Sequence, residues 1–227
     1  TLSHAGYIKR VPASTYRTQR RGGRGVTGQS LREEDFVESV FSASTHDYLL
    51  FFTNMGRVHR RKGYQIPEAG RTARGTNIVN ILPLEQGEKV TAGITVHDFD
   101  EDNLMFVTRQ GTVKRLELQS LNTARKAGIR ALTLADGDEL IAVLKTTGDE
   151  DILLATAHGM AICFNENDVR IMGRDAAGVR GIALDADDYV VGAGIAAEGK
   201  QLLTVTENGY GKRTEIEEYL RLGEDGR

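Results

Sequence analysis

The sequence lacks the cysteine pairs that stabilise small secreted domains and the long apolar segments that cross membranes. Its one cysteine, Cys163, cannot form an internal disulfide. No apolar run approaches the roughly 18 residues that a membrane span needs, and the chain does not open with a charged segment followed by an apolar one. These absences predict a soluble protein with no membrane partner in a reducing compartment, the cytoplasm.

Tryptophan is absent and proline occurs three times, whereas 26 of the 227 residues are glycine. This composition favours many tight turns over long helices. With 40% hydrophobic residues, the chain has ample material for a core, and all-β domains of this length can be single domains. The first residue is not Met and the opening residues resemble the end of a strand, so we expect a fragment of a larger polypeptide forming one domain over 1–227.

The net charge of −3 conceals a strong segregation of charge along the chain. Five segments hold 25 of the 29 Lys and Arg residues but only 11 of the 32 Asp and Glu residues: 1–28, 53–75, 108–130, 156–181 and 206–227. Their net charge is +14, against −17 for the rest. If these segments fold equivalently, a protein of mildly acidic pI carries a basic stripe.

The basic segments are copies of one repeated unit. Each copy has a first glycine, and the successive spacings are 50, 55, 48 and 50 residues, at Gly6, Gly56, Gly111, Gly159 and Gly209. A second glycine follows the first after 19, 19, 17 and 19 residues, at Gly25, Gly75, Gly128 and Gly178. A period near 50 indicates a repeat architecture, with units near 1–50, 51–105, 106–155, 156–205 and a partial unit at 206–227.

Within each copy the hydrophobic pattern is that of β-strands. Apolar or alternating runs occupy 36–44 and 48–53, and Asn54-Met55-Gly56 then turns the chain into another run. Later copies predict strands over 139–145, 152–156, 160–164, 189–195, 201–206 and 210–213, and the residues after Gly25, Gly75 or Gly178 can begin a fourth strand. Four antiparallel strands in about 50 residues match a propeller blade. The predicted fold is all-β, with weak helical turns only at 12–16 and 216–219.

One heptapeptide is the strongest candidate for a binding site: Gln19, Arg20, Arg21, Gly22, Gly23, Arg24 and Gly25. It has no apolar side chain to bury, so it forms a loop. Glycines let backbone N–H groups approach an anion, and the guanidinium forks match phosphate oxygens. A solvated Arg/Gly segment is the alternative, but the basic residues of the other copies favour phosphate binding.

Basic residues recur near both glycines of the unit. Pairs or triplets follow the first glycine, at Lys9-Arg10, Arg60-Arg61-Lys62, Lys114-Arg115 and Lys212-Arg213, whereas the fourth copy has Ile162-Cys163. Others precede the second glycine or lie in the same segments: Arg17, Arg57, Arg71, Arg74, Arg125, Lys126 and Arg174. We expect these side chains to face outward and to contact DNA phosphates without reading sequence, with the fourth copy contributing least.

Metal and catalytic motifs are not evident. The run Asp98 to Asn103 resembles the start of a calcium loop, but its twelfth position is Arg109 instead of a bidentate Glu. The five histidines show no metal-ligand spacing, and Cys163 has no evident partner for nucleophilic catalysis. The acidic clusters 136–139 and 185–188 fit turns. The sequence predicts neither a catalytic residue nor a metal or cofactor site in this chain.

The heptapeptide, together with 7–10, 70–75, 172–181 and 208–213, resembles the C-terminal domains of DNA gyrase A proteins over nearly the whole chain. This resemblance implies a β-pinwheel, a propeller-like disc whose neighbouring blades exchange strands and whose basic outer rim wraps double-stranded DNA. It also implies an A2B2 complex with the N-terminal region of gyrase A and with gyrase B. That gyrase supercoils DNA negatively, in the cytoplasm at the nucleoid, with ATP and Mg bound elsewhere in the enzyme.

The chain departs from that family in its number of blades. The family usually has six, whereas this sequence holds four full periods and the start of a fifth, which predicts an incomplete six-bladed disc; no functional residue is assigned beyond Arg213. Three alternatives remain. The corresponding domain of topoisomerase IV generally has a degenerate heptapeptide, a protein-interaction propeller would lack salt-dependent affinity for DNA, and a propeller hydrolase would need clustered inward-facing acids.

Overall fold

The computed structural model of the chain describes residues 1–16, 27–29, 35–100, 102–125 and 127–219. These residues form strands and short 3-10 helices and contain no α-helix, which confirms the all-β prediction. They belong to two compact units, one made of Thr1–Asp98 and Ala124–Ile129, the other of Phe99–Thr123 and the residues from Arg130 onward. Nowhere in the described part is there a helix long and apolar enough to cross a bilayer.

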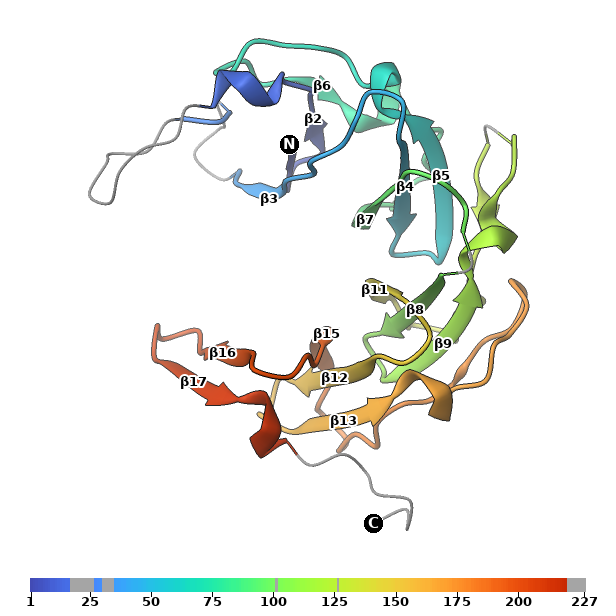
Figure 1. Cartoon of the computed structure of the whole chain (residues 1–227), viewed down its shortest axis with the longest axis vertical. Helices are drawn as coiled ribbons and strands as arrows, with labels where there is room; N and C mark the ends of the chain where they lie inside the picture. The colour runs from blue at the N-terminus through green and yellow to red at the C-terminus, as the bar shows by residue number, and fades with distance from the viewer. Residues whose placement is uncertain (17–26, 30–34, 101, 126, 220–227) are drawn as a thin grey trace. The chain divides into compact units, whose positions relative to one another are not determined.

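The first unit is built on two four-stranded antiparallel sheets (Figure 1). One has the order β3-β1-β2-β6, from Leu2–Ser3 (β1), Tyr7–Ile8 (β2), Val37–Ser39 (β3) and Thr76–Asn77 (β6). The other has the order β10-β5-β4-β7, from Tyr48–Thr53 (β4), Arg57–Lys62 (β5), Val90–Val96 (β7) and Ile129–Arg130 (β10). The 3-10 helices Gly63–Gln65 (η2) and Ile78–Asn80 (η3) lie between strands of the two sheets, and Ala13–Thr15 (η1) lies between β2 and β3 of the first sheet.

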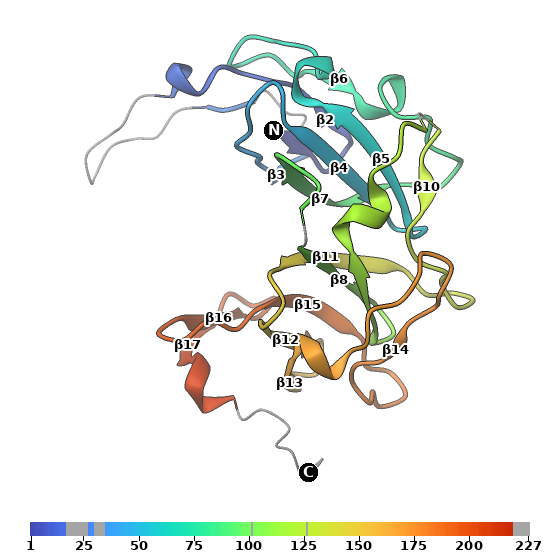
Figure 2. The ribbon, with the colours of Figure 1, turned by 45° about the vertical axis from the view of Figure 1, so that its right-hand side comes forward.

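The second unit contains sheets of four, three and two strands (Figure 2). The first has the order β11-β8-β9-β14, from Asn103–Thr108 (β8), Thr112–Glu117 (β9), Leu140–Thr146 (β11) and Val179–Arg180 (β14). The next is β13-β12-β15, from Asp151–Thr156 (β12), Ala161–Asn165 (β13) and Val190–Ile195 (β15), and the last pairs Gln201–Val205 (β16) with Gly211–Glu215 (β17). The 3-10 helices are Leu118–Leu121 (η4), Glu166–Asp168 (η5) and Ile216–Glu218 (η6).

The first glycines of all five copies occupy equivalent hairpin turns, which confirms the repeat. Their φ values are positive: 82° for Gly6, 73° for Gly56, 82° for Gly111, 85° for Gly159 and 81° for Gly209. Each glycine N–H donates to the carbonyl of the residue three positions earlier. Residues with a Cβ rarely adopt this conformation, so the turn itself requires the glycine.

A hydroxyl and an acid close these hairpins. The residue three before the first glycine is Ser or Thr in every copy, and its hydroxyl accepts the N–H of the residue four positions later. The Thr53 hydroxyl donates to Glu88 over 2.8 Å, while Asp138 and Asp188 each accept two backbone N–H groups at the equivalent turns. The acidic clusters 136–139 and 185–188 are therefore turns, and one acid of each fixes a hairpin.

The fourth strand of a sheet comes from the following copy of the repeat. β6 begins directly after Gly75 and pairs with the first hairpin in the register Tyr7↔Asn77. β14 begins directly after Gly178 and pairs with β9 in the register Val179↔Val113. The predicted fourth strand after the second glycine is thus confirmed for these two copies, and it is exchanged between neighbours as the resemblance implies. The corresponding residues 25–26 lie outside the described part.

The strands of each unit bury an apolar core. β4 is buried along almost its whole length, and Phe51 packs with Leu49 and Leu82 in the first unit. In the second unit, Met105 and Leu154 belong to one buried cluster. These rigid strands supply the platform on which the loops that follow the hairpins are fixed.

His97, which follows β7, provides a pH-dependent tie to the start of β4. Its Nδ1 lies 2.7 Å from Oδ1 of Asp47. This hydrogen bond, with the charge of Asp98, raises the pKa of His97 above its usual value. Because the folded-state pKa exceeds the unfolded one, the stabilisation is fully present below about pH 6.5 and is lost as pH rises through the folded-state pKa.

We expect Asp47→Asn to bring the pKa of His97 down toward its usual value, because the hydrogen-bonding carboxylate is lost. The measurement is an NMR titration of the imidazole carbons of both proteins. The signal of His158, in the other unit, serves as the internal control. An unchanged His97 titration in the variant would show that Asp47 does not interact with the ring in solution.

Candidate nucleic-acid interface

Part of the predicted DNA-binding set lies outside the described residues. This part comprises the heptapeptide 19–25, Arg17 and Lys126. Their role in DNA contact stays a prediction. The remaining basic residues are placed by the structure, and they fall into three groups: buried, half-buried and exposed.

Lys9 and Lys114 are buried, so the expectation that they face outward is wrong. The exposed fraction is 2% for Lys9 and 0% for Lys114. The ammonium of Lys9 donates to the carbonyls of Gly70, Arg71 and Ala73, and that of Lys114 to those of Ala131, Arg174 and Ala176. An ammonium has three N–H donors, and here all three are used within the protein. Neither lysine can contact a phosphate without leaving its site.

Arg115, the partner of Lys114 in the predicted pair, is also buried. Its Nε lies 3.1 Å from Oε2 of Glu166, whose side chain is fully buried, and its Nη1 donates to the Glu166 carbonyl and to Asn167. The expectation of an outward-facing Arg115 is therefore wrong as well. The guanidinium joins β9 to η5 and balances a buried carboxylate.

The loops before the second glycine keep their arginines near the surface. Arg71, Arg74 and Arg174 are half-buried, and Arg125 of the third copy is exposed. Arg71 donates to the carbonyl of Thr27 over 2.9 Å, and the Arg74 guanidinium lies 3.6 Å from the ring centroid of Tyr7. Stacking on an aromatic ring holds an arginine in one direction while leaving N–H donors at its edge.

Two predicted residues are tied to neighbouring acids. Arg10 Nη1 lies 3.0 Å from Oε2 of Glu68, and Arg57 pairs with Glu85. Both arginines are half-buried and both acids are largely exposed. Arg10 also donates to the carbonyl of Ile66 over 3.2 Å, and Arg57 to that of Ala127 over 2.9 Å, so both guanidinium groups are engaged within the protein as well as with these acids.

The other basic residues of β5 are half-buried along the strand. Arg61 donates twice to the carbonyl of Ile81, and burial lowers the pKa of its guanidinium. The Lys62 ammonium and the Arg60 guanidinium both lie over the ring of Tyr48, 3.3 and 4.7 Å from its centroid. Arg60 and Lys62 therefore share one aromatic platform, whereas Arg61 serves mainly to hold the η3 region.

Exposed basic residues complete the set. Lys212 and Arg213 lie exposed on β17. Two exposed arginines that the charge pattern did not single out, Arg130 and Arg180, stand two residues after the second glycines Gly128 and Gly178. Their common offset was the signal that could have revealed them.

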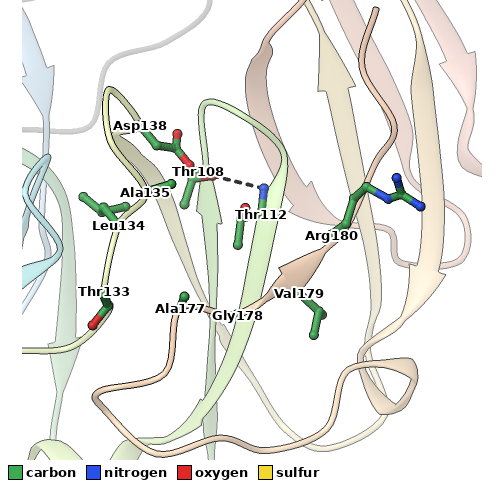
Figure 3. A pocket seen from close by; sticks show the side chains of 10 residues that line it. All are labelled: Thr108, Thr112, Thr133, Leu134, Ala135, Asp138, Ala177, Gly178, Val179 and Arg180. Atoms are coloured by element: carbon green, nitrogen blue, oxygen red, sulfur yellow. Dashed lines mark hydrogen bonds between the residues drawn. The ribbon is translucent and has the colours of Figure 1, made fainter.

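A small hollow of about 140 Å³ lies in the second unit beside the loop that precedes Gly178. Figure 3 shows Thr108, Thr112 and Asp138 around it, with the guanidinium of Arg180 pointing away. The Asp138 carboxylate accepts the N–H groups of Gln110 and Glu139. A phosphate placed in this hollow would meet an anion, so the hollow is no phosphate site.

The residues with metal-binding or nucleophilic chemistry are engaged elsewhere. Asp100 and Asp102, from the calcium-like run, lie 3.5 and 2.6 Å from the ammonium of Lys145. Cys163 is buried. Among the described residues, no three His, Cys, Asp or Glu side chains gather closely enough to hold a metal ion.

Repeated hairpins, exchanged strands and loops with basic side chains define a propeller-type repeat domain. A family model described as "DNA gyrase C-terminal domain, beta-propeller" matches residues 1–44, 47–97, 102–147, 150–197 and 200–226. The chain belongs to this family.

Individual relatives agree with this assignment. The DNA gyrase A protein of Staphylococcus epidermidis is 50% identical over 223 residues, which cover 96% of this chain and 25% of the relative. The solved "Structure of DNA gyrase A C-terminal domain" is 29% identical with a TM-score of 0.78, covering 97% of this chain and 72% of that one. The "Crystal structure of the C-terminal domain of DNA topoisomerase IV" is 28% identical with a TM-score of 0.81, covering 97% and 68%. The chain spans about a quarter of the length of the gyrase A protein that it matches.

Proposed function

We propose that this chain binds and wraps double-stranded DNA through the phosphate contacts of its basic loops. The observation that carries the proposal is the recurrence of arginines at two fixed offsets from the second glycine. Half-buried Arg71 and Arg174 stand four residues before it, and exposed Arg130 and Arg180 stand two residues after it. Phosphate contacts position a protein on the duplex and carry no sequence information. We propose that residues 1–227 act together as one DNA-wrapping domain.

Wrapping requires bending, and bending sets the sequence preference. Curving a site of 20–30 base pairs costs on the order of 1–6 kcal/mol, depending on its sequence. The basic loops must offset this cost through the contacts that the bend permits. We therefore expect flexible sites to bind more tightly than stiff ones of equal length, although no base is read directly.

Family membership supports a role in a larger enzyme. We propose that the full-length protein is the A protein of a DNA gyrase, which assembles with gyrase B into an A2B2 complex in the bacterial cytoplasm. In that enzyme, ATP hydrolysis and strand cleavage occur in other parts, and this domain contributes no catalytic residue. Its contribution is to return wrapped DNA to the cleaved segment, which gives supercoiling its negative sign.

The test of DNA binding is a gel-shift titration of the 227-residue chain on a duplex of more than about 100 base pairs at several salt concentrations. Each neutralised phosphate releases counterions, so log affinity is expected to fall linearly with log salt by about 0.9 per contact. A protein-interaction module would show no such affinity for bare duplex. Binding that is absent, or independent of salt, would overturn the proposed function.

A second candidate is the equivalent domain of topoisomerase IV, because the solved topoisomerase IV domain superposes with a TM-score of 0.81. The heptapeptide 19–25 favours gyrase, since topoisomerase IV domains generally have it in degenerate form. The enzyme assembled with its partner polypeptide distinguishes them. Negative supercoiling of relaxed plasmid supports gyrase, whereas relaxation and decatenation without supercoiling support topoisomerase IV.

A further inference from the structure

The two buried lysines occupy the same place in two copies of the repeat. Lys9 and Lys114 are each the third residue after the first glycine, Gly6 or Gly111. Each ammonium reaches across to the loop that precedes the second glycine of the next copy. The shared acceptors are the carbonyls four and two residues before that glycine: Arg71 and Ala73 for Lys9, Arg174 and Ala176 for Lys114.

The glycine that ends each loop contacts the residue just before the lysine. Gly75 and Gly178 have φ values of 92° and 100°, and a Cβ on either would lie 2.5 Å from a carbonyl oxygen, that of Ile8 or Val113. Loops 70–75 and 173–178 are therefore held by this close backbone approach and by the ammonium. A further hydrogen bond adds to each: the Gln29 amide donates to the Arg74 carbonyl, and the Thr133 hydroxyl donates to the Asp175 carbonyl. The arginine side chains of these loops, Arg71, Arg74 and Arg174, are half-buried on the held backbone.

The third loop, 122–128, supplies an internal comparison. The residue at the lysine position is His59, and a Cβ on the loop's glycine, Gly128, would lie 2.6 Å from the His59 ring and 3.1 Å from the Val58 carbonyl oxygen. His59 is buried, its Nε2 lies 3.5 Å from Oε1 of Glu88, and no hydrogen bond joins its ring to the described residues of the loop. The spacing between the first and second glycines is two residues shorter in this copy, and Arg57 donates to the Ala127 carbonyl of the loop over 2.9 Å.

We propose that Lys9 and Lys114 are positioning residues that hold loops 70–75 and 173–178 in the conformation in which their arginines meet DNA. Neither lysine touches the nucleic acid. Burying an ammonium is unfavourable unless its donors are satisfied, and the three carbonyls satisfy them only while the loop keeps this shape. Loss of the ammonium removes this donor from the loop carbonyls and loosens the loop, although Gly70 still accepts the N–H of Ala73 and Ala176 that of Thr133. This inference rests on the proposed DNA binding and names the residues that prepare the surface for it.

The first measurement follows the loops without DNA, by hydrogen–deuterium exchange and mass spectrometry on the 227-residue chain. Lys9→Met is expected to speed exchange in 70–75, and Lys114→Met in 173–178, on the order of tenfold each, because local opening then costs less. Loop 122–128 should be unchanged in both variants. Lys212→Met, at the same offset but exposed, is the matched control and should alter none of the three loops.

The second measurement asks whether the lysine acts through the arginine. One phosphate contact changes affinity about eightfold per tenfold change in salt, so we expect Lys114→Met and Arg174→Ala each to weaken duplex binding about two- to eightfold at 0.1 M salt. The double variant should bind no more weakly than Arg174→Ala alone, since a loosened loop and a missing guanidinium forfeit the same contact. Lys9→Met with Arg71→Ala repeats the test in the other unit if Lys114→Met fails to fold.

The outcomes separate this inference from the proposed function. Faster loop exchange with non-additive loss of affinity supports it. Unchanged loop exchange in the lysine variants overturns the holding role. Additive losses of affinity, or faster exchange with full affinity, overturn the positioning of DNA contacts. In each of these cases, salt-dependent binding by the unmodified chain still supports the proposed function. A chain that binds no duplex overturns the proposed function itself, and the DNA role of the lysines with it, whatever the loops do.

Discussion

Replacing Arg20, Arg21 and Arg24 together by alanine is expected to abolish negative supercoiling by the whole enzyme while leaving relaxation and decatenation active. These reactions differ in whether DNA must be wrapped back toward the cleaved segment. Basic residues recur in several copies of the repeat, whereas three arginines and three glycines within seven residues occur only in this loop. We therefore expect the heptapeptide to contribute a specific step of the proposed wrapping beyond its share of charge.

The same variant is expected to bind duplex with a shallower salt dependence. Three lost phosphate contacts lower the slope of log affinity against log salt by up to about three, and a footprint of six to ten contacts weakens about 10³- to 10⁵-fold between 50 and 200 mM salt. The control variant replaces three exposed basic residues, Lys89, Arg170 and Lys200, by alanine and so removes the same amount of positive charge. If the triple variant supercoils at the unmodified rate, the heptapeptide is an ordinary solvated loop.

Glu166→Ala is expected to cause a large loss of stability. The Glu166 carboxylate is fully buried 3.1 Å from Arg115, and it accepts the Thr146 hydroxyl and the N–H groups of Gly148 and Glu150 over 2.7 to 2.9 Å. Its removal leaves a buried guanidinium without its anion and three donors without acceptors. Breaking a buried pair from one side costs about 3–5 kcal/mol of unfolding free energy.

Urea unfolding followed by circular dichroism measures this loss. The double variant Glu166→Leu with Arg115→Met is expected to be more stable than Glu166→Ala, because removing both charges leaves neither uncompensated. Glu207→Ala, at an exposed position, should change stability by less than about 0.5 kcal/mol. A loss of under about 1 kcal/mol for Glu166→Ala would mean that water reaches the Arg115 side chain and replaces the carboxylate.

The repeat and its strands could be predicted because hydrophobic period and glycine spacing are local signals. Most of the predicted strands lie within two residues of those observed, such as 139–145 against Leu140–Thr146. The expected strand over 36–44 is shorter, at Val37–Ser39, because its partner β1 offers only two residues to pair with. The helical turns at 12–16 and 216–219 appear as η1 and η6.

The roles of individual basic residues could not be predicted from charge alone. Lys9 and Lys212 occur in the same local sequence, Gly-Tyr-x-Lys-Arg, yet one is buried and the other exposed. What buries Lys9 is a set of carbonyls more than 60 residues further along the chain. Likewise, Arg115 finds Glu166 at a separation of 51 residues. A charge pattern reports where cations stand in sequence, whereas burial depends on which distant backbone arrives beside them.

The exchange of strands between copies limits how blades can be gained, lost or shuffled. The hairpins with Lys9 or Lys114 three residues after their first glycine contact loops from copies in which the two glycines are 19 residues apart. The hairpin with His59 at that position contacts the loop of the copy in which they are 17 residues apart. Recombination that joined Lys9 to the loop of that copy would leave an ammonium without its carbonyls. The copies of the repeat are therefore not interchangeable. Each hairpin is complementary to the loop that contacts it from the next copy. We therefore expect a chimaera to fold well only if the hairpin and that loop come from the same parent.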